Sequence, residues 1–361
     1  MNGPWTSFTP APMEGHGGYN RSSEVQAAGL SPAVPLLEAA ARTVPLVDGP
    51  APIVIADYGA SEGRNSLGPM AAAIARLRAR AGVERAICVV HTDLPGNDFA
   101  ALFETLESDP GSYLRGDAAT FASAVGRSFY GQILPPESVT LGWSSWAVQW
   151  LSRSPGPIPD QVQIAYSRDE AARAAYHRQS AEDWRTFLVH RGRELRAGGR
   201  LVLLTMALDD DGAFGYAPLV EAVYGGLMAL VDEAFIRADE VERMVIPTVG
   251  RSRADLGAPF AETGAFAGLA IEHLDVFHGE DGIWSEFERT GDAAAFGARW
   301  AAFNRASVFP TLALGLDGGA QDPRAAAFFT RMQAVVAARL AAEPVPMVMP
   351  LARMVLVRND H

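Results

Sequence analysis

The segment at residues 53–65, IVIADYGASEGRN, constrains the fold more than any other part of this 361-residue chain. Its apolar run 53–56 predicts a buried parallel strand that ends on Asp57, and a helix is expected from about residue 66 to 81. Gly59 and Gly63 in the intervening turn would let the backbone approach a ligand, beside the N–H groups of the helix N-terminus. The dinucleotide pattern G-x-G-x-x-G is absent, and the spacing D-x-G-x-x-x-G that replaces it is also compatible with an ordinary strand–turn–helix that binds nothing.

Apolar and helical segments alternate over the first part of the chain. Strands are expected at 53–56, 87–91, 139–142 and 201–206, with helical patterns at 31–46, 69–81 and 171–195. This alternation predicts a parallel sheet with helices on both faces. We expect the pair Gly198-Gly199 to end the long helix before the last of these strands.

The pattern changes after residue 208. Helical blocks at 219–245 and 292–308 flank a strand candidate at 269–277, and a short strand is expected at 354–357. We therefore expect a Rossmann-like α/β core at 49–207. Helical cap insertions would cover 208–260 and 280–320, and the C-terminal part of the core sheet 261–279 and 321–361.

The composition excludes several classes of protein. A net charge of −12 without a basic block argues against nucleic acid or an anionic membrane as the partner. All thirty basic residues are Arg, which is typical of a GC-rich genome, and we expect a bacterial one. Because the chain has no lysine, neither a pyridoxal Schiff base nor a P-loop lysine is possible. Cys88 is the only cysteine, which rules out disulfides and zinc ribbons, and we expect it to be buried. Without a signal-like or membrane-spanning segment, the protein is expected to be cytoplasmic.

Five segments resemble one known family in the same order along the chain. They are MEGHGGYNRSSEVQ at 13–26, ADYGASEGRN at 56–65, DLPGNDF at 93–99, RSFYG at 127–131 and SSWAVQWLS at 144–152. The second is similar to motif I of class I S-adenosylmethionine (SAM) methyltransferases. Together they resemble the SABATH methyltransferases, which methylate carboxyl groups of small acids or the nitrogens of xanthines. The resemblance implies a class I SAM-methyltransferase core with a helical cap.

The resemblance also implies which residues hold SAM. Asp93 would accept hydrogen bonds from both ribose hydroxyls, as carboxylates do in dinucleotide folds. Asp57 would meet the cationic part of the cofactor, or else cap the following helix. The remaining positions that match cofactor-binding residues are Tyr19, Ser23, Gly59, Asn65, Leu94, Ser128 and Phe129. Residues 1–48 would form an arm and a helix that close over the active site.

On the acceptor side, Gln26 and Trp150 match the catalytic residues whose amide and indole N–H groups bind the acceptor carboxylate. Xanthine-methylating relatives usually lack the glutamine, so Gln26 favours carboxyl methylation. Trp146, Gln149 and Val220 are expected to line the substrate pocket. No histidine matches a catalytic position, and His91 is expected simply to end its strand.

The sequence therefore predicts an enzyme, a SAM-dependent carboxyl O-methyltransferase acting on a small, aromatic acid. An ionised carboxylate is already a nucleophile near neutral pH, so no general base is required. We expect no metal, a homodimer, and the acid as the only other partner. The alternatives are an N- or O-methyltransferase for a heterocycle or phenol, and a non-catalytic SAM-binding sensor. A nicotinamide-dependent dehydrogenase is disfavoured, because its glycine spacing is missing.

Overall fold

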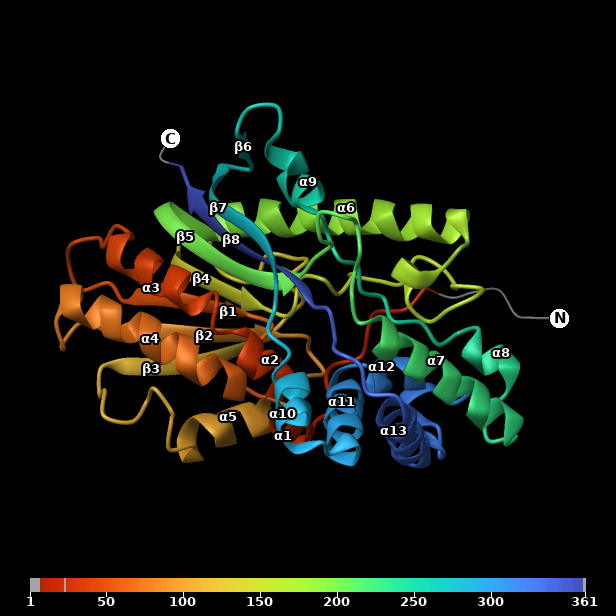
Figure 1. Ribbon diagram of the computed structural model, residues 1–361. Coiled ribbons are helices and arrows are strands. Elements are labelled where there is room, and N and C mark those ends of the chain that lie inside the picture. Colours follow the sequence, from red (N-terminus) through yellow and green to blue (C-terminus); the bar gives the residue numbers. More distant parts are fainter. Residues whose placement is uncertain (1–6, 23, 360–361) are drawn as a thin grey trace.

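The computed structural model describes residues 7–22 and 24–359, without the side chains of residues 24, 27 and 28. Its centre is an eight-stranded sheet with the order β3-β2-β1-β4-β5-β8-β7-β6 (Figure 1). The strands are β1 Ile53–Tyr58, β2 Ile87–Asp93, β3 Thr120–Gly126, β4 Val139–Ser145, β5 Leu195–Met206, β6 Ala265–Phe266, β7 Leu269–His278 and β8 Pro350–Arg358. Strands β1 to β5 are parallel, whereas β8 and β7 add antiparallel pairs beyond β5. The expected α/β sheet is confirmed.

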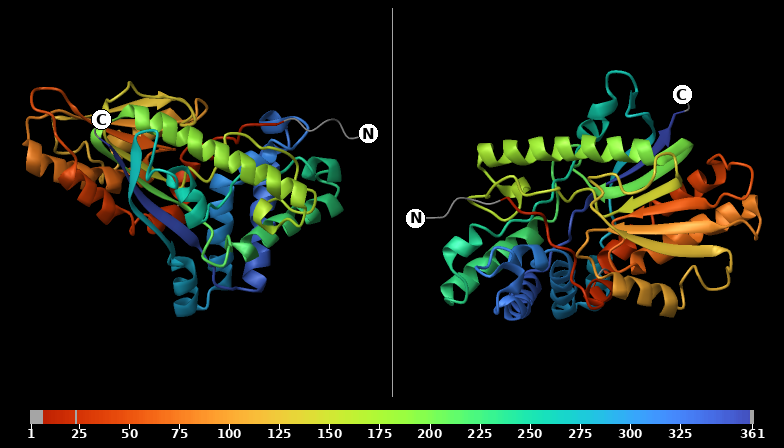
Figure 2. Two further views of the ribbon diagram at one scale, coloured as in Figure 1. Left: turned by 90° about the horizontal axis from the view of Figure 1, so that it is seen from above. Right: turned by 180° about the vertical axis from the view of Figure 1, so that it is seen from behind.

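Helices cover both faces of this sheet, as the alternating pattern predicts. On one face lie α3 (Val34–Thr43) and α4 (Arg64–Ala81), whose buried side chains pack with Ile53 and Ile55. The long helix α6 (Glu170–Glu194) covers the other face (Figure 2). There Trp184 and Phe187 pack with Leu201. Helix α5 (Phe99–Ser108) follows β2 and contributes Leu102 and Leu106 to the first of these two layers. Each face is therefore sealed by an apolar layer.

A separate helical layer forms the cap. It contains α7 (Ala217–Asp232), α8 (Ala238–Val241), α10 (Gly282–Thr290), α11 (Ala293–Ser307), α12 (Phe309–Ala313) and α13 (Ala325–Ala342). Trp300, Phe309 and Phe328 lie at the centre of one apolar cluster that these helices share. Helix α13 was expected within the C-terminal part of the core, but it packs against α11 and α7 instead. The apolar stripe of α13 reveals that it is buried but does not reveal which layer it joins.

Short elements connect these layers. They are α1 (Gly18–Ser22) and α2 (Glu24–Gly29) in the N-terminal arm, α9 (Arg253–Gly257), and the 3₁₀ turns Ile164–Tyr166, Ala258–Phe260 and Gly319–Gln321. In Figure 1, α1 and α2 lie beneath the sheet beside α10 and α11, where the cap meets the core.

The expectation for the glycine pair is wrong. Helix α6 ends at Glu194, and Gly198-Gly199 lies inside β5, where the pairing with β4 shifts register between Val139 and Leu141. Gly198 has φ +69°, so the glycine pair forms a bulge rather than a helix end. Strand β3 was not predicted, because its segment TFASAVG at the edge of the sheet has no continuous apolar run.

The sheet order places the carboxyl ends of β1, β2 and β4 at one edge. Chain order reverses there, because β1 pairs with β2 on one side and with β4 on the other. Asp57 pairs with His91 across the first of these ladders and with Trp143 across the second. In open α/β sheets, ligands bind in the crevice outside such a switch point.

Candidate active site

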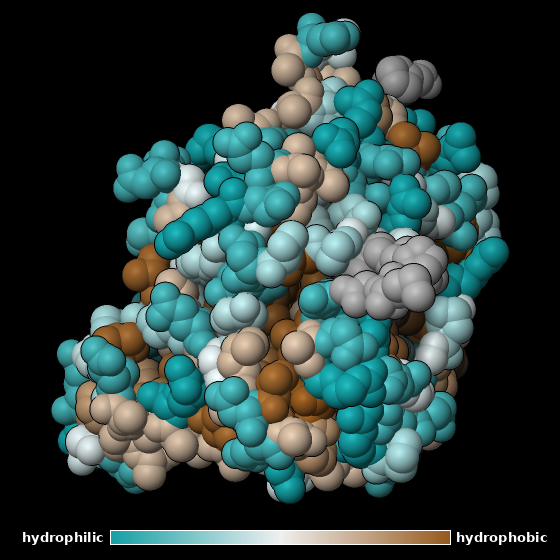
Figure 3. Space-filling view, turned by 90° about the vertical axis from the view of Figure 1, so that its right-hand side faces the viewer, coloured by the Kyte–Doolittle hydropathy of each residue, from teal (hydrophilic) through white to brown (hydrophobic). Residues whose placement is uncertain are grey.

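A cleft of about 1260 Å³, including its open mouth, lies at this edge between the core and the cap. The turn after β1, the segment after β4 and helices α7 and α11 all contribute to its walls. Figure 3 shows the neighbouring cap side of the molecule as a largely hydrophilic surface, with hydrophobic side chains visible in a furrow near its centre. The cleft is thus the place where groups from distant parts of the sequence meet.

Asp93, the last residue of β2, lines the cleft. Its two carboxylate oxygens accept hydrogen bonds of 2.7 Å from the backbone N–H groups of Ser61 and Leu94. Burial raises the pKa of Asp93 to about 6, although these two hydrogen bonds act the other way. Leu94 lines the same part of the cleft, as expected. The Asp93 carboxylate, which can accept hydrogen bonds, and the apolar side chain of Leu94 therefore lie together, as a ribose with its attached base requires.

The turn after β1 brings the backbone close to Asp93. Gly59 has φ +92°, and a Cβ at this position would lie 2.6 Å from the Cβ of Ala147. Ser61 has φ +48°, and its Oγ is buried without a hydrogen-bond partner among the described residues. Both residues line the cleft. Sequence reasoning missed Ser61, because its left-handed backbone conformation becomes visible only in the structure.

Asp57 is placed differently from its expected role. It is 2% exposed and does not line the cleft. Its Oδ2 accepts a hydrogen bond of 2.6 Å from Ser66 and lies 2.8 Å from Nδ1 of His91. Nε2 of His91 lies 2.7 Å from the hydroxyl of Tyr113. Asp57 thus joins β1 to the first turn of α4, close to the alternative capping role.

His91 does not end its strand, contrary to expectation. β2 continues to Asp93, and His91 is fully buried as the middle member of the Asp57–His91–Tyr113 chain. Buried polar side chains need such partners, since an unpaired one would lose its hydrogen bonds to water. This chain of side chains fixes the relative position of the two strand ends that carry the site.

Ser128 and Phe129 both line the cleft, on the loop after β3. Arg191, which is fully buried, donates hydrogen bonds to the carbonyls of Phe129 and Gly131. Arg191 also pairs with Glu194 at 2.9 Å, and Glu194 accepts hydrogen bonds from the N–H groups at residues 133 and 134. The α6 ion pair therefore holds the loop against the cleft.

The N-terminal arm closes another side of the cleft. Residues 9–13 line it, and the arm is anchored by hydrogen bonds from Ala11 N to Thr311 Oγ1 and from Glu14 N to the carbonyl of Ala306. Glu62, buried just after the β1 turn, accepts hydrogen bonds from the backbone N–H groups of residues 17 and 20. The arm is held at both ends of the site.

Tyr19 on α1 is a buried side chain of the anchored arm. It lines the cleft, and burial raises its pKa well above the usual value, although its side-chain hydrogen bond with Asn65 acts the other way. Asn65 itself lies at the start of α4, outside the cleft lining. The predicted cofactor residue Ser23 falls outside the described residues.

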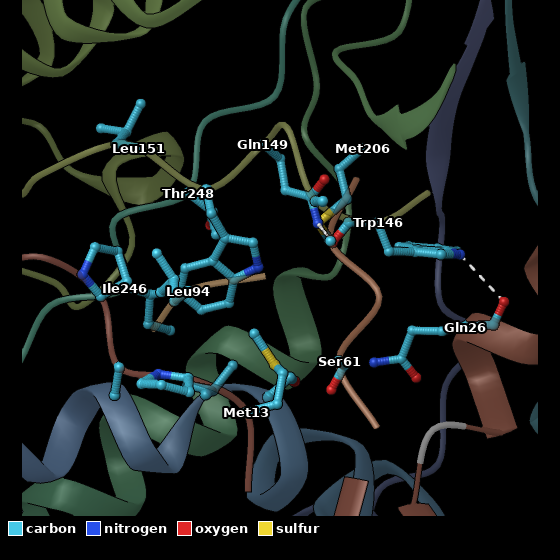
Figure 4. A pocket seen from close by; sticks show the side chains of 18 of the residues that line it. Met13, Gln26, Ser61, Leu94, Trp146, Gln149, Leu151, Met206, Ile246 and Thr248 are labelled. Carbon is cyan, nitrogen blue, oxygen red and sulfur yellow. Dashed lines mark hydrogen bonds between the residues drawn. The ribbon is translucent and has the colours of Figure 1, made fainter. Parts of the chain in front are cut away.

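Gln26 and Trp150, the two residues expected to bind the acceptor, both line the cleft. Gln26 is 3% exposed, and its Oε1 is buried without a hydrogen-bond partner among the described residues. In Figure 4 its side chain extends from α2 toward the middle of the cleft, below the indole of Trp146. The backbone of Trp150 is fixed by a 2.5 Å hydrogen bond from the Tyr130 hydroxyl, while its indole N–H makes no hydrogen bond to a described residue.

The other three predicted pocket residues also line the cleft, but two of them use their polar groups within the protein. Trp146 donates its indole N–H to the carbonyl of Gln26, at 3.1 Å. Gln149 donates to the carbonyl of Trp146 at 2.6 Å and accepts from the Thr205 hydroxyl at 3.0 Å. Val220 contributes an apolar surface from α7. Met13, Met206 and Ile246, which Figure 4 also shows, make the same wall hydrophobic.

Among the described residues, no group of three or more His, Cys, Asp and Glu side chains could hold a metal ion. Within the same part of the chain, no helix is long and apolar enough to cross a membrane.

The switch-point cleft, the close backbone turn and the Asp93 carboxylate at the end of β2 define the class: a SAM-dependent methyltransferase with a class I fold. A model of the family described as SAM dependent carboxyl methyltransferase matches residues 7–354. The chain belongs to this family, which confirms the expected SABATH resemblance and SAM as the cofactor. Asp93, Leu94, Gly59 and the unpartnered Ser61 hydroxyl are the described groups that fit SAM.

Two relatives illustrate the similarity. Over 247 residues the chain is 30% identical to Methyltransferase FUS9 of Gibberella moniliformis. The aligned region covers 68% of this chain and 66% of FUS9. Over 291 residues it is 28% identical to salicylate carboxymethyltransferase of Clarkia breweri, covering 77% and 78%. The expected bacterial origin has no support in these relatives.

A solved structure of loganic acid methyltransferase with S-adenosylhomocysteine is similar in fold. The TM-score is 0.76 at 22% sequence identity, and the match covers 97% of this chain and 99% of that one. The core and the cap are therefore both part of the shared fold.

Proposed function

We propose that the protein methylates the carboxylate of a small aromatic acid, giving a methyl ester and S-adenosylhomocysteine. One observation carries this proposal: the acceptor end offers two neutral N–H donors and no general base. Asp93 at the cofactor end is the only charged side chain among the described residues that line the cleft, and no histidine, arginine or cysteine lies there. An acceptor that needs no deprotonation by the protein suits such a site, and a carboxylic acid is already ionised near neutral pH.

Gln26 and Trp150 would bind and orient that carboxylate. Each can donate an N–H to one carboxylate oxygen, and hydrogen bonds to a charged group contribute roughly 1.5–3 kcal/mol each. Both are held in place through their backbones, Gln26 by the indole of Trp146 and Trp150 by the hydroxyl of Tyr130. Such fixed donors would leave one carboxylate oxygen presented for attack.

The hydrophobic wall would bind the body of the acid. Met13, Met206, Val220 and Ile246 come from the arm, β5, α7 and the segment after α8, so closing the arm over the acid would exclude water. SAM, when bound, supplies a methyl group activated by its sulfonium sulfur. Alignment of two reacting groups in a closed site can contribute roughly 7–11 kcal/mol in well-oriented systems.

The test is a screen of aromatic and aliphatic acids with isotopically labelled SAM, followed by mass spectrometry. We expect at least one acid to give a labelled methyl ester that alkali hydrolyses, and its carboxamide analogue to give no product. A product that resists alkali, or an amide or xanthine methylated as fast as any acid, would replace carboxyl methylation by N-methylation. Binding of SAM without turnover of any acceptor would point to the sensor alternative.

A further inference from the structure

Asn304 is a buried amide on the cleft wall that carboxyl methylation does not use. It lies on α11, is 3% exposed and lines the cleft beside Phe303 and Val308. Its Nδ2 has one contact, 3.4 Å to the carbonyl of Trp300 one turn earlier, which is too long for a strong hydrogen bond. Its Oδ1 accepts no hydrogen bond from a described residue. The amide therefore keeps most of its hydrogen-bonding capacity for whatever enters the cleft.

The other side-chain amides of the cleft show how unusual this is. Gln163 accepts from the backbone N–H of Ala165 at 2.6 Å and donates to the carbonyl and hydroxyl oxygens of Thr248, both at 2.9 Å. Gln149 is paired at both ends as well. Only Gln26, assigned to the carboxylate, and Asn304 retain unused amide groups among the described lining residues.

The wall around Asn304 is apolar, so the amide would lose its hydrogen bonds to water when an acid fills the cleft. Phe303 on α11 and Val308 just after its end line the cleft beside it, and the hydroxyl of Ser307 donates to the carbonyl of Phe303 at 2.7 Å. A buried polar group left without a partner is destabilising, and a site built around one discriminates against ligands that cannot pair with it. An acid with a second polar group would restore the lost hydrogen bonds.

Charge decides what kind of second group fits. The described lining contains no arginine, lysine or histidine, so a second carboxylate would be buried without a cation. An amide both donates and accepts, and it suits a neutral hydroxyl, carbonyl or carboxamide group. Resting on the proposed carboxyl methylation, we infer that the acceptor is a monocarboxylic acid bearing a neutral hydrogen-bonding group, which Asn304 binds.

Matched pairs of acids test this inference. Benzoate and cinnamate are each compared with their ortho-, meta- and para-hydroxylated forms and with a dicarboxylate of similar size. We expect the best hydroxylated acid to exceed its parent about tenfold in kcat/KM, the effect of one good hydrogen bond. The dicarboxylates should be the poorest substrates.

Asn304→Leu should remove the preference, because leucine has a similar size and no hydrogen-bonding group. For this variant, kcat/KM for the hydroxylated acid should fall to the level of the parent acid, while kcat/KM for the parent stays or rises. Ala298→Leu, at an exposed position of the same helix, is the control and should retain the wild-type preference. Calorimetry of the same acids with the protein loaded with S-adenosylhomocysteine gives a readout independent of turnover.

Two results would overturn the inference: a wild-type protein that prefers the unsubstituted parent in every pair, or an Asn304→Leu variant that lowers both members of a pair equally. If that variant does not fold by circular dichroism, Asn304→Ala takes its place, and the wild-type pairs remain decisive. Failure of the proposed function looks different, since then SAM binds but no acid of either kind is methylated.

Discussion

The indole N–H of Trp146 donates a hydrogen bond of 3.1 Å to the backbone carbonyl of Gln26 and so joins the segment after β4 to α2. The contact is close, because a Cβ on Gly29 would lie 2.5 Å from Cζ2 of the same indole. Trp146 therefore positions the helix that carries Gln26, whereas its N–H is not available to the acceptor. Trp146 was predicted only to line the pocket, and it also positions Gln26.

Trp146→Phe should raise KM for the acid several-fold with little change in SAM affinity, because the aromatic wall remains and the anchor of Gln26 is lost. Loss of one buried hydrogen bond should also lower the free energy of unfolding by about 1 kcal/mol. Trp184→Phe is the matched control, since it removes a similar indole bond, 3.0 Å to the carbonyl of Leu256, away from the cleft. Steady-state kinetics that show equal KM changes in both variants would contradict the positioning role.

Asp93→Ala should weaken SAM binding more than tenfold, because two ribose hydroxyls would lose a charged acceptor together. Asp57→Asn should instead lower stability and change SAM affinity far less, since its carboxylate contacts Ser66 and His91 rather than the cleft. Calorimetry with SAM and urea denaturation measure both quantities. If the Asp57 variant loses as much affinity as the Asp93 variant, Asp57 contacts the cofactor after all.

The pH dependence of SAM binding should also report on Asp93. Burial raises its pKa to about 6, so the carboxylate that we propose accepts from the ribose is mostly protonated at pH 5. SAM affinity should therefore rise about tenfold from pH 5 to pH 7.5 and level off above it. Asp93→Asn should abolish this dependence, and a wild-type affinity that is flat over the range would contradict the assignment.

The raised pKa of Asp93 also makes the free energy of unfolding of the SAM-free protein fall as the pH rises from about 4 to 6. In the unfolded chain the pKa of Asp93 is the ordinary 3.8. Between about pH 4 and pH 6 the folded protein therefore holds a proton on Asp93 that the unfolded chain has released. The contribution of Asp93 to the stability of the SAM-free protein is therefore present below pH 4 and is lost as the pH rises through 6.

Glu194→Gln should destabilise the fold by about 3–5 kcal/mol, because the fully buried guanidinium of Arg191 would lose its charged partner. Glu194 also accepts a hydrogen bond of 2.8 Å from Tyr58 and holds the loop that carries Phe129. Urea denaturation measures the change. Glu286→Gln breaks an exposed pair with Arg289 and should have little effect. Equal stability of the two variants would show that the buried pair does not hold the loop.

How far the sequence predicts this molecule depends on how local each signal is. The apolar runs of β1 and β2 and the periodicity of α4 are local, and the structure contains all three close to their predicted bounds. The half-exposed edge strand β3 has no such run, because an edge strand buries less of its surface. Strand and helix positions are therefore easier to predict than packing partners, as α13 also shows.

The site shows the same division. Asp93, Gln26 and Trp150 lie in segments that resemble the family strings, and all three reach the cleft. Asp57 lies in such a segment too, but the direction of its carboxylate depends on His91 and Ser66, which no spacing rule specifies. Asn304 has no motif around it, and the packing of α11 against its neighbours places it in the cleft wall.

The central claim is that Gln26 and Trp150 together hold the acceptor carboxylate. Its most direct test is a double-mutant cycle on kcat/KM for the best acid, with Gln26→Ala, Trp150→Phe and their combination, and with SAM affinity measured in parallel. Trp150→Phe removes the N–H and keeps an aromatic ring. We expect each single variant to lower kcat/KM for the acid with SAM affinity within about twofold of wild type, and the double variant to lose less than the sum of the two, because both donors bind one group. Acid kinetics that do not change in either single variant, or effects that simply add, would contradict the claim.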